Sequence, residues 1–196
     1  MGFLSIFKRK NKQELLLPET PQSRDAVRYG AERSRAESGT KSERLSLAKN
    51  TDTHREILYY LAEHDPDPKV RRALVQNAAL PIQASGALAA DENVDIRLAL
   101  AERLIKLLPE LSKDKHSELY AYAVQALGTL ALDEVLKIRL ALTSALKDYA
   151  YTPPKIAGKL ARDVERKVSE PILKFCAALA DEDLLEIISK HPASWA

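Results

Sequence analysis

Residues capable of acid–base, metal or nucleophilic chemistry are few in this chain. The four histidines are separated by 10, 52 and 75 residues, spacings that match no zinc motif: His54, His64, His116 and His191. The dipeptide His64-Asp65 also occurs in metal-dependent phosphohydrolases, but no further His and Asp ligands on matching helices can be recognised. We interpret His64 as a residue near the carbonyl end of a helix. The histidines therefore predict no metal site.

The single cysteine, Cys176, lies among Phe175, Ala177 and Ala178 and is expected to be a small core residue. No histidine is near it in sequence, and the chain has no glycine-rich phosphate loop. One cysteine excludes a disulfide framework and suits a reducing compartment such as the cytoplasm. We predict a protein that is not an enzyme, with no catalytic residue, no cofactor and no bound metal.

A repeated pattern of acidic residues and arginines is the strongest polar signal. Residues 67–77, 93–103 and 136–142 each carry a β-branched residue, an arginine, and then a run of small and apolar residues. The anchor arginines are spaced by 27, 26 and 42 residues: Arg44, Arg71, Arg97 and Arg139. The long last interval indicates an insertion over residues 104–132.

The repeated arginines have two possible roles, binding a phosphate or acidic ligand or joining neighbouring repeats. The acid next to each arginine favours the second role, because a guanidinium group suits a carboxylate or a helix-end carbonyl of the next repeat. The predicted structural ladder consists of Asp67, Arg71, Asp91, Arg97, Asp133 and Arg139.

Apolar residues recur at helical spacing from about residue 41 onward, and no stretch alternates as a strand would. Thr53 and Glu56 form an expected capping box, Asp67-Pro68 opens a helix that reaches Asn77, and Pro109 is expected to end a helix over 93–108. A second helix of small and apolar residues lies between anchors, so each repeat is a helical hairpin. Because one hairpin cannot bury both faces, we predict an all-α fold in which hairpins stack into an α-solenoid.

The segments that contain Val70-Arg71, Ile96-Arg97 and Ile138-Arg139 resemble the HEAT-repeat motif. The periods of 26 and 27 residues are similar to those of the leucine-rich-repeat-variant subclass. Residues 168–188 resemble the carboxy-terminal part of an uncharacterised bacterial HEAT-like domain family. The resemblance covers residues 41–196 and implies a fold, but it implies no agreed activity.

Charge divides the chain unevenly. Residues 1–50 carry 11 basic and 6 acidic side chains (11 − 6 = +5), and residues 51–196 carry 19 and 22 (19 − 22 = −3), which gives the total of +2. We divide the chain into an apolar and basic segment with a linker (1–22), a polar helical lead-in (23–40) and the repeat domain (41–196). The acidic repeat domain argues against nucleic-acid binding, which needs a basic stripe.

The first twelve residues consist of an apolar head followed by cations: Phe3, Leu4, Ile6, Phe7, Lys8, Arg9, Lys10 and Lys12. This segment could dock on an anionic membrane at the inner face, since each basic residue near such a surface contributes about 1 kcal/mol. The alternatives are a disordered tail, or a strap packed on the open end of the stack.

The sequence predicts a protein–protein interaction scaffold that binds another protein through the concave face or the exposed end of its stack. The loop over residues 112–118 is a candidate contact region because it interrupts the repeat. A peripheral membrane adaptor and, less favoured, a nucleic-acid-binding solenoid are the alternatives. The sequence specifies neither the partner nor the oligomeric state.

Deletion of residues 1–12 tests the membrane alternative. If the apolar head and its cations dock on lipid, the deletion should abolish flotation with vesicles that contain anionic lipid. Equal flotation of the full chain and the deleted chain would eliminate this alternative.

Overall fold

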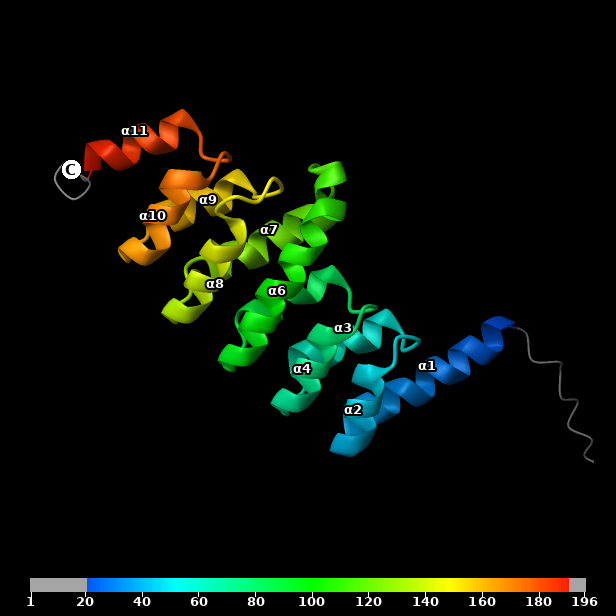
Figure 1. Cartoon of the computed structure of the whole chain (residues 1–196). Coiled ribbons are helices and arrows are strands. Elements are labelled where there is room, and N and C mark those ends of the chain that lie inside the picture. The colour runs from blue at the N-terminus through cyan, green and yellow to red at the C-terminus, as the bar shows by residue number, and fades with distance from the viewer. Residues whose placement is uncertain (1–20, 191–196) are drawn as a thin grey trace, which may run out of the picture.

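The computed structural model describes residues 21–190, which form eleven α-helices and two short 3-10 helices without a strand among them (Figure 1). The all-α prediction is confirmed for this part of the chain. The α-helices are α1 (Pro21–Ser38), α2 (Lys41–Lys49), α3 (Arg55–His64), α4 (Pro68–Gln76), α5 (Ser85–Ala89), α6 (Val94–Leu111), α7 (Glu118–Leu130), α8 (Leu136–Leu146), α9 (Pro154–Ala161), α10 (Arg166–Phe175) and α11 (Asp181–Lys190). The 3-10 helices are η1 (Ile82–Ala84) and η2 (Ser112–Asp114).

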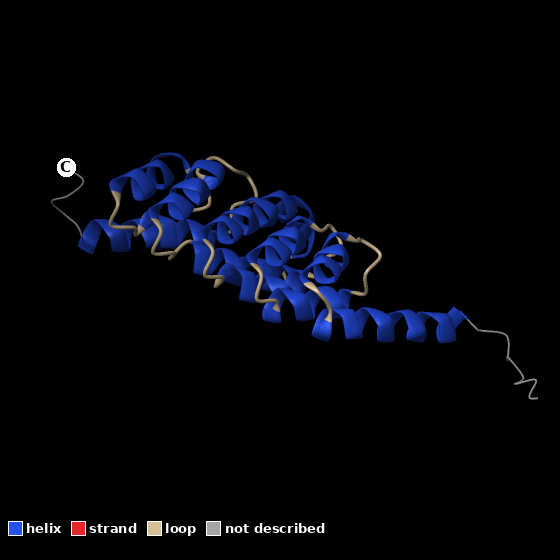
Figure 2. Ribbon diagram, turned by 90° about the horizontal axis from the view of Figure 1, so that it is seen from below, coloured by secondary structure: helices blue, strands red, loops and turns tan. Residues whose placement is uncertain are grey.

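The helices lie in two rows. The even-numbered helices α2, α4, α6, α8 and α10 contact one another in this order, and so do the odd-numbered helices α1, α3, α5, α7 and α9 (Figure 1). The chain therefore passes back and forth between the rows, and we call an odd helix with the even helix that follows it a unit. The outermost helices, α1 and α11, lie at opposite ends of the rows (Figures 1 and 2).

One continuous core lies between the two rows, and the even helices contribute to it at repeated positions. In α4 and α6 the residue before the anchor arginine and the residue four positions after that residue are fully buried, as in the pairs Val70 with Leu74 and Ile96 with Leu100. The same two positions are filled in α8 by Ile138 and Leu142 and in α10 by Val168 and Ile172. Burying each such side chain contributes about 1.5–3 kcal/mol to folding.

The capping box lies one helix earlier than predicted. Thr53 does not cap α3; its hydroxyl donates to the carbonyl of Leu47 at 2.9 Å and so holds the turn after α2. The box is formed at the start of α2, where Glu43 Oε2 accepts from the Thr40 N–H at 2.7 Å and Thr40 Oγ1 accepts from the Glu43 N–H at 3.4 Å. The sequence contains both spacings, but the hydroxyl of Thr53 is taken by the preceding helix.

Pro109 does not end its helix, contrary to the prediction. Helix α6 continues through it to Leu111, although Pro109 has no N–H for an intrahelical hydrogen bond. Leu108 is fully buried and Leu111 packs on the core, so this turn is held by tertiary contacts. The predicted insertion therefore lengthens two helices: α6 has 18 residues and α7 has 13, against 9 in α4 and 8 in α9.

His54, at the start of α3, joins α1 to the rest of the molecule. Its Nδ1 lies 2.8 Å from Glu32 Oε2 and its Nε2 lies 3.2 Å from Asp25 Oδ1, both carboxylates on α1. The bond to Glu32 raises the pKa of His54, and Asp25 adds to this, whereas burial and the charge of Arg28 oppose it. The ring of Tyr29 packs edge-on at 5.3 Å. Attachment of α1 is therefore strongest when His54 is protonated.

The His54→Gln substitution should make stability less dependent on pH. A raised pKa means that the stabilisation is complete below the ordinary histidine pKa of about 6.5 and is lost as pH rises through the folded-state value. At pH 5.5 the variant should be less stable than the wild type by about 1 kcal/mol, and the difference should shrink toward pH 9. Thermal unfolding followed by circular dichroism measures this.

His64→Gln is the matched control, because the His64 side chain is 56% exposed. The interpretation fails if the two variants show the same dependence of melting temperature on pH.

Candidate functional site

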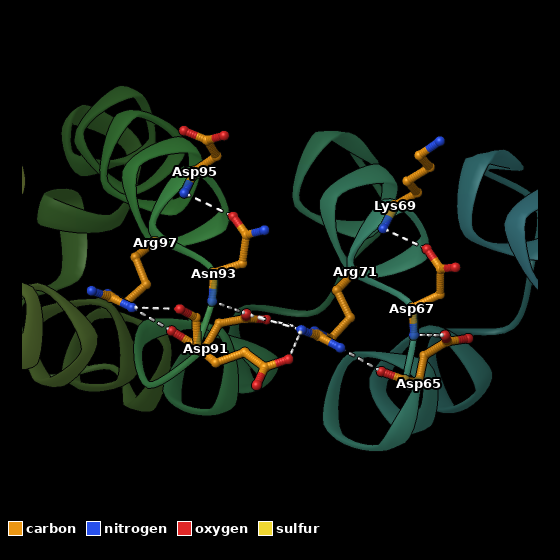
Figure 3. Close-up of polar contacts among 9 residues, drawn as sticks. Asp65, Asp67, Lys69, Arg71, Asp91, Asn93, Asp95 and Arg97 are labelled. Atoms are coloured by element: carbon orange, nitrogen blue, oxygen red, sulfur yellow. Dashed lines mark hydrogen bonds and ion pairs between the residues drawn. The ribbon is translucent and has the colours of Figure 1, made fainter.

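The arginines of the even helices bind aspartates of the neighbouring unit. Arg71 Nε donates to Asp91 Oδ2 at 2.6 Å and its Nη2 donates to Asp91 Oδ1 at 3.1 Å. Arg97 repeats both bonds to Asp133, also at 2.6 and 3.1 Å. Each arginine is the fourth residue of its helix, and each aspartate lies in the turn between the two helices of the next unit. Two such units are drawn in Figure 3.

Each arginine also binds the aspartate of its own unit through the main chain. Arg71 Nη1 donates to the carbonyl of Asp65 at 2.8 Å, and Arg97 Nη1 donates to that of Asp91 at 2.6 Å (Figure 3). Asp91 therefore accepts from two arginines and, in addition, from the N–H of Asn93 at 2.8 Å. The contacts form a continuous chain, which we call the Arg–Asp ladder: Arg44, Asp65, Arg71, Asp91, Arg97, Asp133, Arg139 and Asp163.

The ladder begins and ends within the described residues. Arg44 Nη1 donates to the carbonyl of Gly39, five residues before it, in place of the aspartate that lies six residues before each of the other ladder arginines. In α10 the fourth residue is Ser169, whose hydroxyl donates to the carbonyl of Glu165 at 3.3 Å. A residue without a carboxylate and a residue without a guanidinium group thus close the two ends.

Five of the six predicted ladder residues lie in the ladder, and Asp67 does not. Asp67 caps α4, where it accepts from the N–H of Lys69 at 2.8 Å, and it pairs with Lys41 at 2.5 Å. The bond from Lys41 lowers the pKa of Asp67. Asp65 takes the ladder position instead. Spacing could have identified it, since Asp65 precedes Arg71 by six residues, just as the other ladder aspartates precede the arginines of their own units.

The ladder side chains are largely buried, so they serve the fold and leave little for a ligand. Arg97 is 7% exposed and Asp133 is 9% exposed. Nitrogens Nε, Nη1 and Nη2 of Arg97 all donate to acceptors within the protein. Binding an external anion here would require breaking contacts that hold consecutive units together.

A separate feature of the odd row is a groove of about 920 Å³ between α7 and α9, which we call the α7/α9 groove. Its α7 side includes a stripe at helical spacing, from Tyr120 through Val124 to Gly128. The remaining lining residues are Lys115, Ala121, Gln125, Thr129, Leu132, Pro153, Pro154, Lys155, Ile156 and Lys159. Most of the lining is apolar, and lysine is the only charged residue type in it.

The groove arises because α7 extends past the start of α9. A Cβ at Gly128 would lie 3.7 Å from Ile156 Cδ1, so these two residues mark where the helices meet. Ten residues of α7 precede Gly128, whereas only two residues of α9 precede Ile156. The first turns of α7 therefore lack a neighbour in α9. Residues of the predicted insertion form this overhang, and Lys115 of the predicted contact loop lies in the lining.

The three groove lysines, Lys115, Lys155 and Lys159, form no ion pair within the part of the chain that the structure describes. Lys159 Nζ donates instead to the carbonyl of Gly128 at 3.0 Å. Tyr120 is half-buried at the groove, and this burial raises the pKa of its hydroxyl, which stays protonated at neutral pH. The arrangement combines an apolar floor with unpaired positive charges.

The residues first considered for chemistry are dispersed. His64 ends α3, where its ring lies 4.9 Å from that of Tyr60, and His116 is exposed in the loop before α7. Cys176 is half-buried after α10, with Sγ 3.9 Å from the carbonyl of Leu146. Over residues 21–190, no three His, Cys, Asp or Glu side chains gather as a metal site would require.

Comparison with known proteins gives no relative for this chain. No family model matches it, and neither curated proteins nor solved structures provide a match.

None of the described helices combines the length and the apolar character needed to cross a membrane. His191 and the predicted membrane contacts lie outside the described residues: Phe3, Leu4, Ile6, Phe7, Lys8, Arg9, Lys10 and Lys12.

The Arg97→Ala substitution should lower the free energy of unfolding by about 3–5 kcal/mol, because it leaves the Asp133 carboxylate buried without its partner. The double variant Arg97→Met/Asp133→Leu should recover most of this loss, since neither charge then remains buried. Urea unfolding provides the measurement.

Arg72→Ala is the control for charge removal alone, because Arg72 is exposed beside the ladder residue Arg71. A structural ladder is contradicted if Arg97→Ala destabilises the protein no more than Arg72→Ala does.

Proposed function

We propose that the chain is a non-enzymatic scaffold that binds another protein, built as an α-solenoid of HEAT-like helical hairpins. The two rows of helices, the repeated core positions and the Arg–Asp ladder support this architecture. Each joins a unit to its immediate neighbours, as is typical of repeat proteins. The groups of the ladder are occupied in holding units together, so recognition falls to other surfaces.

The observation that carries the proposal is the α7/α9 groove. It is wide, largely apolar and lined by unpaired lysines, and it lies where the insertion interrupts the repeat. An exposed apolar surface rimmed by polar groups is typical of a site for a protein partner. Exposed Leu132, at 64% of its full accessible area, extends the apolar surface beyond the end of α7. Membrane docking through residues 1–12 stays a prediction from the sequence.

Filling the groove tests this proposal. Gln125→Trp places a large side chain at an exposed position of the lining, and we expect it to reduce partner capture at least ten-fold without lowering the melting temperature. Partners captured from a lysate of the source cells by the full chain are quantified by mass spectrometry. Lys137→Trp, at an exposed position on α8, is the matched control. Equal capture by the wild type and Gln125→Trp would reject this groove as the docking site.

A further inference from the structure

Resting on the proposed function, we infer the chemistry of the partner: the α7/α9 groove binds a short segment with one or two large apolar side chains flanked by carboxylates. The apolar part of this inference follows from the floor of the groove. Val124 is half-buried and Ile156 is buried, and Lys159 covers Gly128, where an added Cβ would lie 3.2 Å from Lys159 Nζ. The open apolar surface of the groove therefore lies along the first turns of α7, which have no neighbour in α9 and can receive side chains supplied by another molecule.

The carboxylates follow from the groove lysines. Lys115 comes from the loop before α7, Lys155 from the first turn of α9, and Lys159 from its second turn, so three separate positions bring positive charge to one groove. The amino-terminal end of α9 adds the positive end of a helix dipole. By contrast, Lys113, two residues before Lys115 and outside the lining, is paired with Glu110 at 2.5 Å. None of the three groove lysines has an ion pair among the described residues, and two of them, Lys115 and Lys155, line the groove at exposed positions.

The dimensions of the groove favour a short segment. From Tyr120 to Gly128 the α7 stripe is about 12 Å long, the length of about two turns of helix. Over the same distance an extended chain places about four residues. A segment of this size needs only a few carboxylates to match three lysines.

A long polyanion fits the surface less well. Residues 51–196 carry a net charge of −3, so a nucleic acid extending beyond the groove would meet a body without a net positive charge. Protein surfaces that bind a nucleic-acid backbone carry basic residues along its path, whereas the groove itself offers three lysines. A protein segment with both apolar and acidic residues matches the apolar lining of the groove and the charge of the groove lysines.

Selection from a library of random decapeptides displayed on phage, with the immobilised full chain as target, tests the inference. We expect the enriched peptides to combine net negative charge with at least one aromatic or branched aliphatic residue. A synthetic, fluorescein-labelled copy of the most enriched peptide should bind with an affinity that falls several-fold when NaCl is raised from 50 to 300 mM, as measured by fluorescence anisotropy.

The variant Lys115→Glu/Lys155→Glu should weaken binding of this peptide more than ten-fold. It leaves Lys159, which bonds to the main chain, in place. The control Lys137→Glu/Lys167→Glu changes the net charge equally at exposed positions on α8 and α10, and binding should stay within two-fold. Both double variants should keep the melting temperature of the wild type.

Three results would overturn the inference: no enrichment, enrichment of neutral or basic peptides, or equal loss of affinity in both double variants. Competition by a 12-nucleotide single strand, with no acidic peptide enriched, would assign the groove to nucleic acid instead. The scaffold proposal has a separate outcome. In that outcome, Gln125→Trp abolishes capture of cellular partners that Lys115→Glu/Lys155→Glu still captures. That result would support the scaffold proposal and would reject the inference that the partner segment is acidic.

Discussion

The arrangement of the helices depends on one repeated contact, an arginine that binds two consecutive turn aspartates. Through its carbonyl one aspartate fixes the arginine within its own unit, and through its carboxylate the next aspartate fixes the neighbouring unit. A shift of one unit along its neighbour would separate Arg71 from Asp91 and leave two charges in a largely buried setting. Losing one partner of a buried pair costs about 3–5 kcal/mol, so the ladder discriminates against other registers more than it adds to stability.

The insertion shows that the Arg–Asp contacts stay the same where the helices between them become longer. Arg71 and Asp91 are 20 residues apart and Arg97 and Asp133 are 36 apart, yet the hydrogen-bond distances are the same. The additional residues lengthen α6 and α7 without displacing α8 from the ladder. An odd helix can therefore change in length while the even row keeps its register. The α7/α9 groove is a direct consequence of this freedom.

Much of the fold can be predicted from local sequence, because periodicity and caps act within a few residues. The helix opened by Asp67-Pro68 and the anchor arginines are examples. The sequence pattern favours Asp67 over Asp65, because Asp67 stands directly before its helix as a cap, whereas the ladder uses the aspartate three positions before the first residue of each even helix from α4 onward. The groove could not be predicted. It depends on the offset between Gly128 and Ile156, two residues that only the packing of α7 against α9 brings together.

The fold distributes the charged side chains of the repeat domain between its interior contacts and its groove. The body over residues 51–196 is net acidic, but its ladder arginines are paired internally, whereas the groove lysines are not. At physiological ionic strength, charges are screened over about 8 Å, so these lysines act on what lies within the groove. An anion that does not also fill the apolar floor gains little there, and an apolar segment that carries cations is repelled. Selectivity for the proposed segment thus requires both properties in one short stretch of chain.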